Sequence, residues 1–384
     1  MAMRRRNFIE AGIGGMAALS VAQGVSRAQS APADLPSAMG IPVVGVDGAD
    51  LTIPYLNDYL NTGATVWQYS GNTIDFGRFD KIQSFVNANA SKVTLAKSYS
   101  DILAAKQVGK VAIVVGVQDL WPLEPPWHAD SDHPPNDWVA NPPTTHLSDY
   151  YERGLRIANL SYNLSSFFGG GCLDPTTPLS RAGRYIVGQM QEMGILVDCS
   201  HSSEQTSLDI VSMAIRPVIC SHSNPVAIAD NPRNISDRLI EGIAKTGGLV
   251  GVSPVNCFLL WSREDAPHAD TGPFPPLASI SQYVDVMDYI RRLVGIDYIG
   301  IGSDFTIGNP PDPYIPPVPS QSFTFPPETT YYQPAGLEYV ENFNQVADLP
   351  VLRAELTRHG YSAVDIAKIL GGNWMRVFGQ AWNS

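Results

Sequence analysis

The sequence has few cysteines and few basic residues for its length. Four cysteines occur among 384 residues, and none forms a CxxC pair or a zinc-ribbon spacing. A cysteine-based zinc module is therefore not expected. Lysine and arginine number 25 against 37 acidic residues, which gives a net charge of −12. A surface this acidic argues against nucleic acid and anionic membranes as partners.

The N-terminal apolar stretch, Ala11–Ala22, is short for a membrane span. It follows Arg5-Arg6, which resembles a twin-arginine export signal, and it precedes Ala28-Gln29-Ser30, a small-x-small cleavage site. No cysteine lies near that site, so a lipid anchor is not expected. We predict that residues 1–30 are a signal peptide and that the mature protein, residues 31–384, is periplasmic or secreted. An uncleaved membrane anchor is the alternative.

Short apolar runs alternate with helical patterns along the rest of the chain. The predicted strands are Val43–Asp47, Ala64–Gln68, Lys110–Val117, Leu155–Leu160, Ile195–Cys199, Pro217–Cys220, Leu249–Pro254 and Tyr298–Gly302. Eight such strands, without an internal repeat, predict an α/β fold, a (β/α)8 barrel with Pro-rich insertions near residues 121–148 and 309–336. A doubly wound open sheet is the alternative. It is weakened because no glycine-rich dinucleotide fingerprint follows the first strand.

Two histidines end two neighbouring predicted strands. Ile195–Cys199 and Pro217–Cys220 are each followed by Ser-His, and the histidines are His201 and His222. A helix's length of residues separates the two runs, which predicts a βαβ unit. Chemistry in α/β barrels is done at the carboxyl ends of the strands. We therefore expect both imidazoles to converge on one metal ion; the alternative is two polar caps on buried strands.

Other polar residues end predicted strands and would face the same mouth of a barrel. They are Asp47, Asp50, Gln118, Asp119, Tyr162, Asn256 and Asp304. Two imidazoles with carboxylates and an open position form the ligand set of a hydrolytic zinc site.

Two of the charged residues near this mouth are candidates for specific roles. Asp304 is a candidate proton carrier, or else a carboxylate that orients a histidine. Arg233 is a candidate for binding a substrate carboxylate, or else a surface ion pair. His128 and His133, with two aspartates between them, favour a solvated loop over an ion site.

Several motifs resemble the membrane (renal-type) dipeptidase family, peptidase family M19. They are VDCSHSS, PVICSHSNPVAIADNPRN, TGGLVGV, DYIGIGSDF and GYSAVDIAKILGGNWMRVF, in this order from about Leu155 to the C-terminus. The resemblance implies a (β/α)8 barrel with a zinc site that cleaves dipeptides. It implies that His201 and His222 hold zinc, that Arg233 binds the substrate carboxylate and that Asp304 is catalytic. It also implies a homodimer.

The sequence departs from that family at three positions. The family has His-x-Asp after the first strand, where Asp47-Gly48-Ala49-Asp50 contains no histidine. Gln118 stands where the family has a glutamate that bridges two metals, and Tyr162 stands where it has a histidine. Two close zinc ions need anionic ligands to offset their repulsion. We therefore expect one zinc ion at His201 and His222, with Asp119, Gln118 or Asp304 as candidates to complete its ligands.

The sequence thus predicts an exported metal-dependent hydrolase that cleaves a dipeptide or a similar small amide. In this hypothesis Asp304 shuttles a proton, and Tyr162 binds substrate by donating a hydrogen bond to an oxyanion. Two alternatives remain. One is a related hydrolase or lyase acting on another small carboxylate substrate, and the other is a binding protein without catalysis.

Overall fold

The structure is a computed structural model that describes residues 42–46, 53–71, 76–120, 123, 143–260, 276–306 and 339–382. The predicted signal peptide, the segment 47–50 and most of both predicted insertions lie outside these residues. The described elements belong to one compact unit of the chain.

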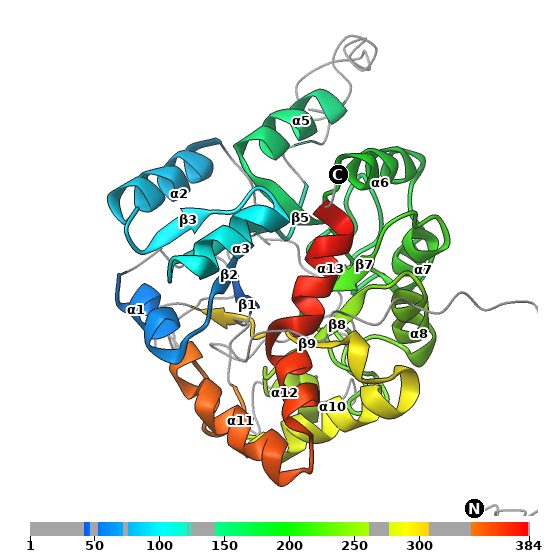
Figure 1. Ribbon diagram of the computed structural model, residues 1–384. Coiled ribbons are helices and arrows are strands. Elements are labelled where there is room, and N and C mark those ends of the chain that lie inside the picture. The colour runs from blue at the N-terminus through cyan, green and yellow to red at the C-terminus, as the bar shows by residue number, and fades with distance from the viewer. Residues whose placement is uncertain are drawn as a thin grey trace, which may run out of the picture. The chain divides into compact units, whose positions relative to one another are not determined.

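A ring of parallel strands forms the centre of this unit (Figure 1). The strands are β1 (Pro42–Val46), β2 (Val66–Gly71), β3 (Val93–Leu95), β4 (Val111–Val117), β5 (Leu155–Asn159), β6 (Leu196–Asp198), β7 (Val218–Cys220), β8 (Leu249–Val252), β9 (Ile299–Ile301) and β10 (Phe305–Thr306). The order is β10-β1-β2-β4-β5-β6-β7-β8-β9. Because β10 follows β9 in the chain and pairs with β1, the ring closes as a barrel.

Helices follow most of the strands and surround the ring. They are α1 (Ile53–Thr62), α2 (Phe76–Ala88), α3 (Tyr99–Gln107), α5 (Pro143–Arg153), α6 (Arg181–Met193), α7 (Glu204–Ser212), α8 (Asp237–Lys245), α9 (Cys257–Leu260), α10 (Ile280–Val294), α11 (Leu349–Arg358), α12 (Ala363–Ala367) and α13 (Asn373–Trp382). Local chemistry fixes several ends. Ser180 caps the start of α6, and Gly194, at φ 85°, ends it.

The apolar core has two parts, one outside the ring and one inside it. Outward-facing strand residues pack against the surrounding helices. Inward-facing residues such as Val66, Val114 and Leu196 pack against Trp374 and Phe378 of α13. Figure 1 shows α13, in red, lying across one end of the ring. The apolar inner residues and α13 therefore fill that end, which leaves the opposite end for polar groups.

The barrel prediction is confirmed, with corrections in detail. All eight predicted strands are present, but the short strands β3 and β10 were not predicted. The helix α1 was also missed. Residues 143–148, predicted as part of a loop, instead begin α5. No helix in the described ranges is both long and apolar enough to cross a membrane.

Candidate active site

The structure brings His201 and His222 into direct contact at the carboxyl ends of β6 and β7. Their Nε2 atoms lie 2.8 Å apart, and the two rings meet edge to face. Both side chains are buried, at 6% and 0% exposure. His201 has a positive φ of 66°, a conformation that is uncommon for a residue with a side chain. The short strands and this turn aim both imidazoles at one point.

Hydrogen bonds at Nδ1 determine which nitrogen of each imidazole carries the proton and which is free. His201 Nδ1 lies 2.7 Å from the side-chain oxygen of Asn163, which also accepts from Cys172. His222 Nδ1 lies 2.7 Å from Ser221 Oγ, and the Ser221 hydroxyl donates to Asp198. Asn163 Oδ1 and Ser221 Oγ therefore each accept a hydrogen bond from an Nδ1–H group. Each Nε2 is left with a lone pair, as in a metal-ligating histidine.

Two lone pairs facing each other at 2.8 Å repel unless a proton or a cation lies between them. Burial, and then the positive charge of Arg233, lower the pKa of His201 and His222 well below the usual range. A shared proton is therefore disfavoured at neutral pH. The pair fits a divalent cation, for which zinc is a common choice with imidazole ligands. Nitrogen ligands of one tetrahedral zinc lie about 3.3 Å apart, so the rings need to open only slightly.

No third ionisable ligand joins this pair among the residues that the structure describes. Within them, the only group of three or more His, Cys, Asp or Glu donor atoms within 4.8 Å is Asp285, Asp288 and His359. Neither Asp119 nor Asp304 forms such a group with the two histidines. The predicted contribution of Asp47 and Asp50 falls on residues outside the described ranges. Among the described His, Cys, Asp and Glu residues, none joins His201 and His222 to form a group of three.

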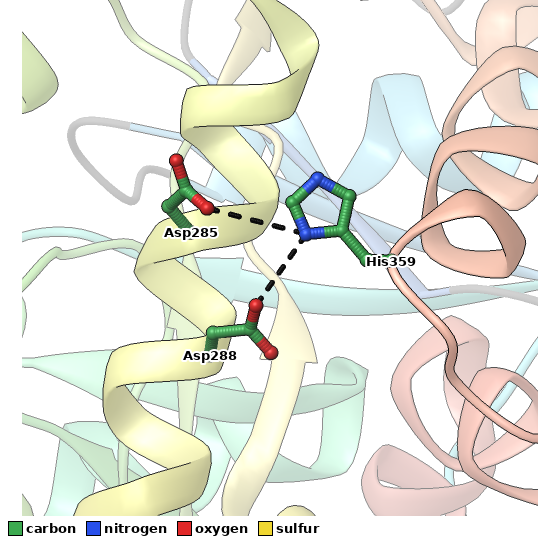
Figure 2. A group of neighbouring side chains, drawn as sticks. All are labelled: Asp285, Asp288 and His359. Carbon is green, nitrogen blue, oxygen red and sulfur yellow. Dashed lines mark hydrogen bonds and ion pairs between the residues drawn. The ribbon is translucent and has the colours of Figure 1, made fainter.

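The Asp285–Asp288–His359 group is an ion-pair network on the outer helices. Figure 2 shows His359 Nδ1 turned toward both carboxylates, 4.0 Å from Asp285 and 3.4 Å from Asp288. Tyr361 donates to the second oxygen of Asp288, and Glu355 lies 3.3 Å from His359 Nε2. The Asp285 side chain is 63% exposed. These contacts tie α10 to the end of α11.

Arg233 lies beside the histidines, and none of the described residues forms an ion pair with it. It is 3% exposed, and its guanidinium donates to the backbone oxygen of His222 at 3.2 Å and lies over the Phe258 ring. In the described part of the chain no carboxylate lies within ion-pair distance of it. The surface ion pair considered from the sequence is therefore wrong. A buried cation without a counter-charge favours an anionic ligand.

Asp304 is buried and its Oδ1 has no hydrogen-bond partner. Burial raises its pKa to about 7, although the charge of Arg233 opposes the rise. The residue has φ 51°, and Asn163 has φ 60°, so three of the four described non-glycine residues with positive φ are at the site. Such strain is concentrated at functional sites. A carboxyl group with a pKa near 7 suits proton transfer.

The remaining predicted site residues differ in their surroundings. The ring of Tyr162 stacks on that of His201 at 4.2 Å. Gln118 is fully buried, and neither end of its amide has a partner. Asp119 is half-buried. Asn256 uses its side-chain oxygen to accept from the Ala278 amide, which is a structural role.

Sequence reasoning missed the residues that orient the histidines. Asp198 ends β6, is 2% exposed, and accepts hydrogen bonds from the backbone amides of Ser200 and Ser221. Burial raises the pKa of Asp198, and these hydrogen bonds oppose the rise. The only indication in the sequence was a carboxylate inside an otherwise apolar strand. Its partner on the neighbouring strand could not be read from local pattern.

The sequence comparison with protein families decides the classification. The model of membrane dipeptidase, peptidase family M19, matches residues 65–313 and 332–384. The chain belongs to the M19 family. The two histidines and Arg233 lie within the matched residues.

Two M19-type relatives are curated dipeptidases from fungi. Dipeptidase ataJ of Aspergillus terreus is 27% identical over 328 residues, covering 79% of this chain and 66% of that protein. Dipeptidase aclJ of Aspergillus oryzae is 29% identical, covering 61% of this chain and 47% of that protein. The chain thus spans 66% and 47% of the lengths of these two relatives.

Solved structures support the fold. An amidohydrolase from Pseudomonas aeruginosa has a TM-score of 0.70 at 26% identity, covering 91% of this chain and 98% of that one. A metallopeptidase from Rhodobacter sphaeroides, crystallised with a phosphinate mimic of a dipeptide, has a TM-score of 0.65 at 18% identity. It covers 89% of this chain and its own full length.

Proposed function

We propose that this protein is an exported, metal-dependent hydrolase that cleaves a dipeptide or a similar small amide. Membership of the M19 family, whose curated relatives include dipeptidases, supports the reaction class. The observation that carries the proposal is the His201–His222 pair. Both Nε2 lone pairs face each other at 2.8 Å, in surroundings that disfavour a proton between them.

His201 and His222 would hold one divalent cation, which we take to be zinc. When bound, such a cation supplies a Lewis acid that makes water nucleophilic at neutral pH. Arg233, buried and without a counter-ion among the described residues, holds the substrate carboxylate and fixes the scissile amide near the histidines.

Two further side chains complete the proposed chemistry. Asp304 accepts the proton of the attacking water at its unpartnered Oδ1 and returns it to the leaving amine. Tyr162, held against His201 by ring stacking, donates a hydrogen bond to the developing oxyanion.

The test is a paired measurement of metal content and amide hydrolysis on the purified chain. We expect about one zinc ion per chain by elemental analysis, and release of free amino acids from at least one member of a dipeptide panel. His201→Ala and His222→Ala should each lose the ion and reduce kcat/KM by roughly 10³-fold or more. His359→Ala changes a histidine of the outer ion-pair network, and this variant should retain both the zinc ion and the activity.

Two results would contradict the proposal. One is a chain that binds no divalent metal when folded, and the other is hydrolysis unaffected by His201→Ala. Binding of small carboxylates without turnover at any added metal would instead support the binding protein without catalysis.

Export and dimerisation are further parts of the proposal. The Arg5-Arg6 motif and the Ala28-Gln29-Ser30 sequence support export. Replacing both arginines with lysine should retain the full-length chain in the cytoplasm, as measured by fractionation and intact mass. The resemblance alone supports a homodimer, which sedimentation would test.

A further inference from the structure

Gln118 has a buried side-chain amide without a hydrogen-bond partner among the described residues. It directly follows β4, is 0% exposed, and neither its Nε2 nor its Oε1 has a hydrogen-bond partner among the residues that the structure describes. Buried amides are nearly always hydrogen-bonded, because an unpaired donor or acceptor away from water is costly. Two unpaired ends on one side chain indicate that a ligand supplies the missing partners.

A second buried glutamine shows what a structural role looks like in this fold. Gln191 of α6 is 2% exposed, and its Oε1 accepts from the backbone amides of Ile215 and Arg216, although its Nε2 has no described partner. It ties a helix to the turn before β7. Gln118 makes no comparable bond to any described residue, so it does not hold two elements together.

The strand register places Gln118 in the same layer of the barrel as Asn159 and Asp198. Val117 pairs with Ala158, and Asn159 pairs with Asp198. Gln118 therefore continues the row of Asn159 and Asp198, at the polar end of the ring opposite α13. Neighbouring parallel strands lie about 4.8 Å apart, so Gln118 is two strands from Asp198 across the same mouth.

The chemistry of an amide limits what Gln118 can recognise. It offers two N–H donors and a carbonyl acceptor and has no charge. A free ammonium group would satisfy only the carbonyl, and it would be buried without a counter-charge from this residue. The carbonyl oxygen of an acyl amide accepts from the Nε2 donors and brings no charge into the buried site. Asp119, the next residue, already has an interaction of its own, and Asp304 is assigned to proton transfer.

We propose that Gln118 recognises an uncharged amide on the amino side of the scissile bond, so that the substrates are N-acylated dipeptides and not dipeptides with a free ammonium group. The inference rests on the proposed function, because Arg233 must hold the carboxylate at the other end. The carbonyl oxygen of the N-acyl amide then accepts from Gln118 Nε2.

The test separates recognition from catalysis. Chelator-treated chain, which should not turn over substrate, is titrated calorimetrically with Ala-Ala and with N-acetyl-Ala-Ala. We expect the acetylated ligand to bind at least about tenfold more tightly, a difference of one buried polar group. Gln118→Leu should reduce this preference to about twofold or less. Gln118→Glu, which adds a negative charge, should reverse it in favour of Ala-Ala.

Gln191→Leu is the matched control, because it removes a buried glutamine at a structural position. It should lower the melting temperature and leave the ligand preference unchanged. Melting curves of the Gln118 variants report whether they fold.

Three outcomes would overturn the inference: no binding of the acetylated ligand, equal or tighter binding of Ala-Ala by the wild-type chain, or an unchanged preference in folded Gln118→Leu. If the preference is present but neither these ligands nor any member of the dipeptide panel is hydrolysed after zinc is restored, the proposed function fails. Recognition of the N-acyl group by Gln118 would then stand as binding alone.

Discussion

The polar groups at the mouth of the barrel fall into two sets that differ in their hydrogen bonding. The partnered set comprises His201, His222, Asn163, Ser221 and Asp198. Asn163 bonds to His201, and Ser221 bonds to both His222 and Asp198. The unpartnered set comprises Gln118, Asp304 and Arg233. The first two have side-chain atoms without a hydrogen-bond partner among the described residues. Arg233 donates hydrogen bonds to His222 and Ser223 but has no described counter-ion.

The difference indicates a division of labour. A metal ligand must be held in one orientation and one tautomer before the ion arrives, so its partners belong to the protein. A group that binds or reacts with substrate must keep its hydrogen-bonding capacity free until substrate arrives. The partnered set is therefore suited to holding a cation, and the unpartnered set to contacting a substrate.

Asp304→Asn should produce the largest loss of activity among changes to the unpartnered set. The amide cannot carry a proton, so kcat should fall by roughly 10²- to 10⁴-fold. Elemental analysis should show unchanged metal content, because Asp304 does not group with the histidines. Loss of the metal in this variant would show that Asp304 helps to hold the cation, and it would contradict the division into two sets.

Arg233→Met should mainly weaken substrate binding. Removing one partner of a buried charge pair costs about 2–5 kcal/mol, so kcat/KM should fall by roughly 30-fold or more. Initial-rate kinetics should show the change chiefly in KM for substrates with a carboxylate. For substrates with an amidated C-terminus, kcat/KM should fall little. An equal fall in kcat/KM for the two kinds of substrate would contradict the role assigned to Arg233.

Ser221→Ala removes the acceptor that holds His222 Nδ1–H. Metal affinity should fall by about 10- to 100-fold, as is typical when a partner of a ligating histidine is lost. Competition with a chelator would measure it. Ser202→Ala is the control, because the buried Ser202 hydroxyl has no partner. Equal effects of both changes would remove the distinction between the two sets.

Asp304→Asn should also alter the pH dependence of stability in the metal-free chain. Burial raises the folded-state pKa of Asp304 from 3.8 to about 7. Between these values the folded state holds a proton that the unfolded state has lost. The wild-type residue therefore stabilises the folded state as pH falls, and this contribution is lost as pH rises through about 7.

The variant has no such proton to bind. The free energy of unfolding of Asp304→Asn should exceed that of the wild type by the largest amount above pH 7. This difference should decrease by about 1.4 kcal/mol per pH unit as the pH falls toward 4. Urea unfolding at several pH values would measure it. A difference that is constant with pH would show that Asp304 is not held at a raised pKa.

Much of the barrel could be predicted from local pattern because its strands are buried on both faces. Runs such as Val111–Val117 are continuously apolar, which is typical of parallel strands between a filled interior and covering helices. The short strands β3 and β10 have no such pattern. They form because neighbouring strands already present hydrogen-bonding edges, which is a property of the assembled sheet.

The candidate site was predictable where position along a strand determines direction. Ser-His after two neighbouring apolar runs placed His201 and His222 at one end of the ring. The partners of those histidines were not predictable in the same way. Asn163 lies 38 residues before His201, and Asp198 bonds to Ser221 across a strand pair, so only the register brings them together.

The sequence by itself determined the family, the alternation of strands and helices, and the residue types at the strand ends, because these depend on local hydrophobicity and on motifs. Only the tertiary structure decided which polar groups have partners. It showed that the lone pairs of two imidazoles face each other, that Arg233 is buried without a described counter-ion and that Gln118 binds nothing described. Hydrogen bonding and burial depend on the distances between strands and loops far apart in the chain, and only the closed barrel sets these.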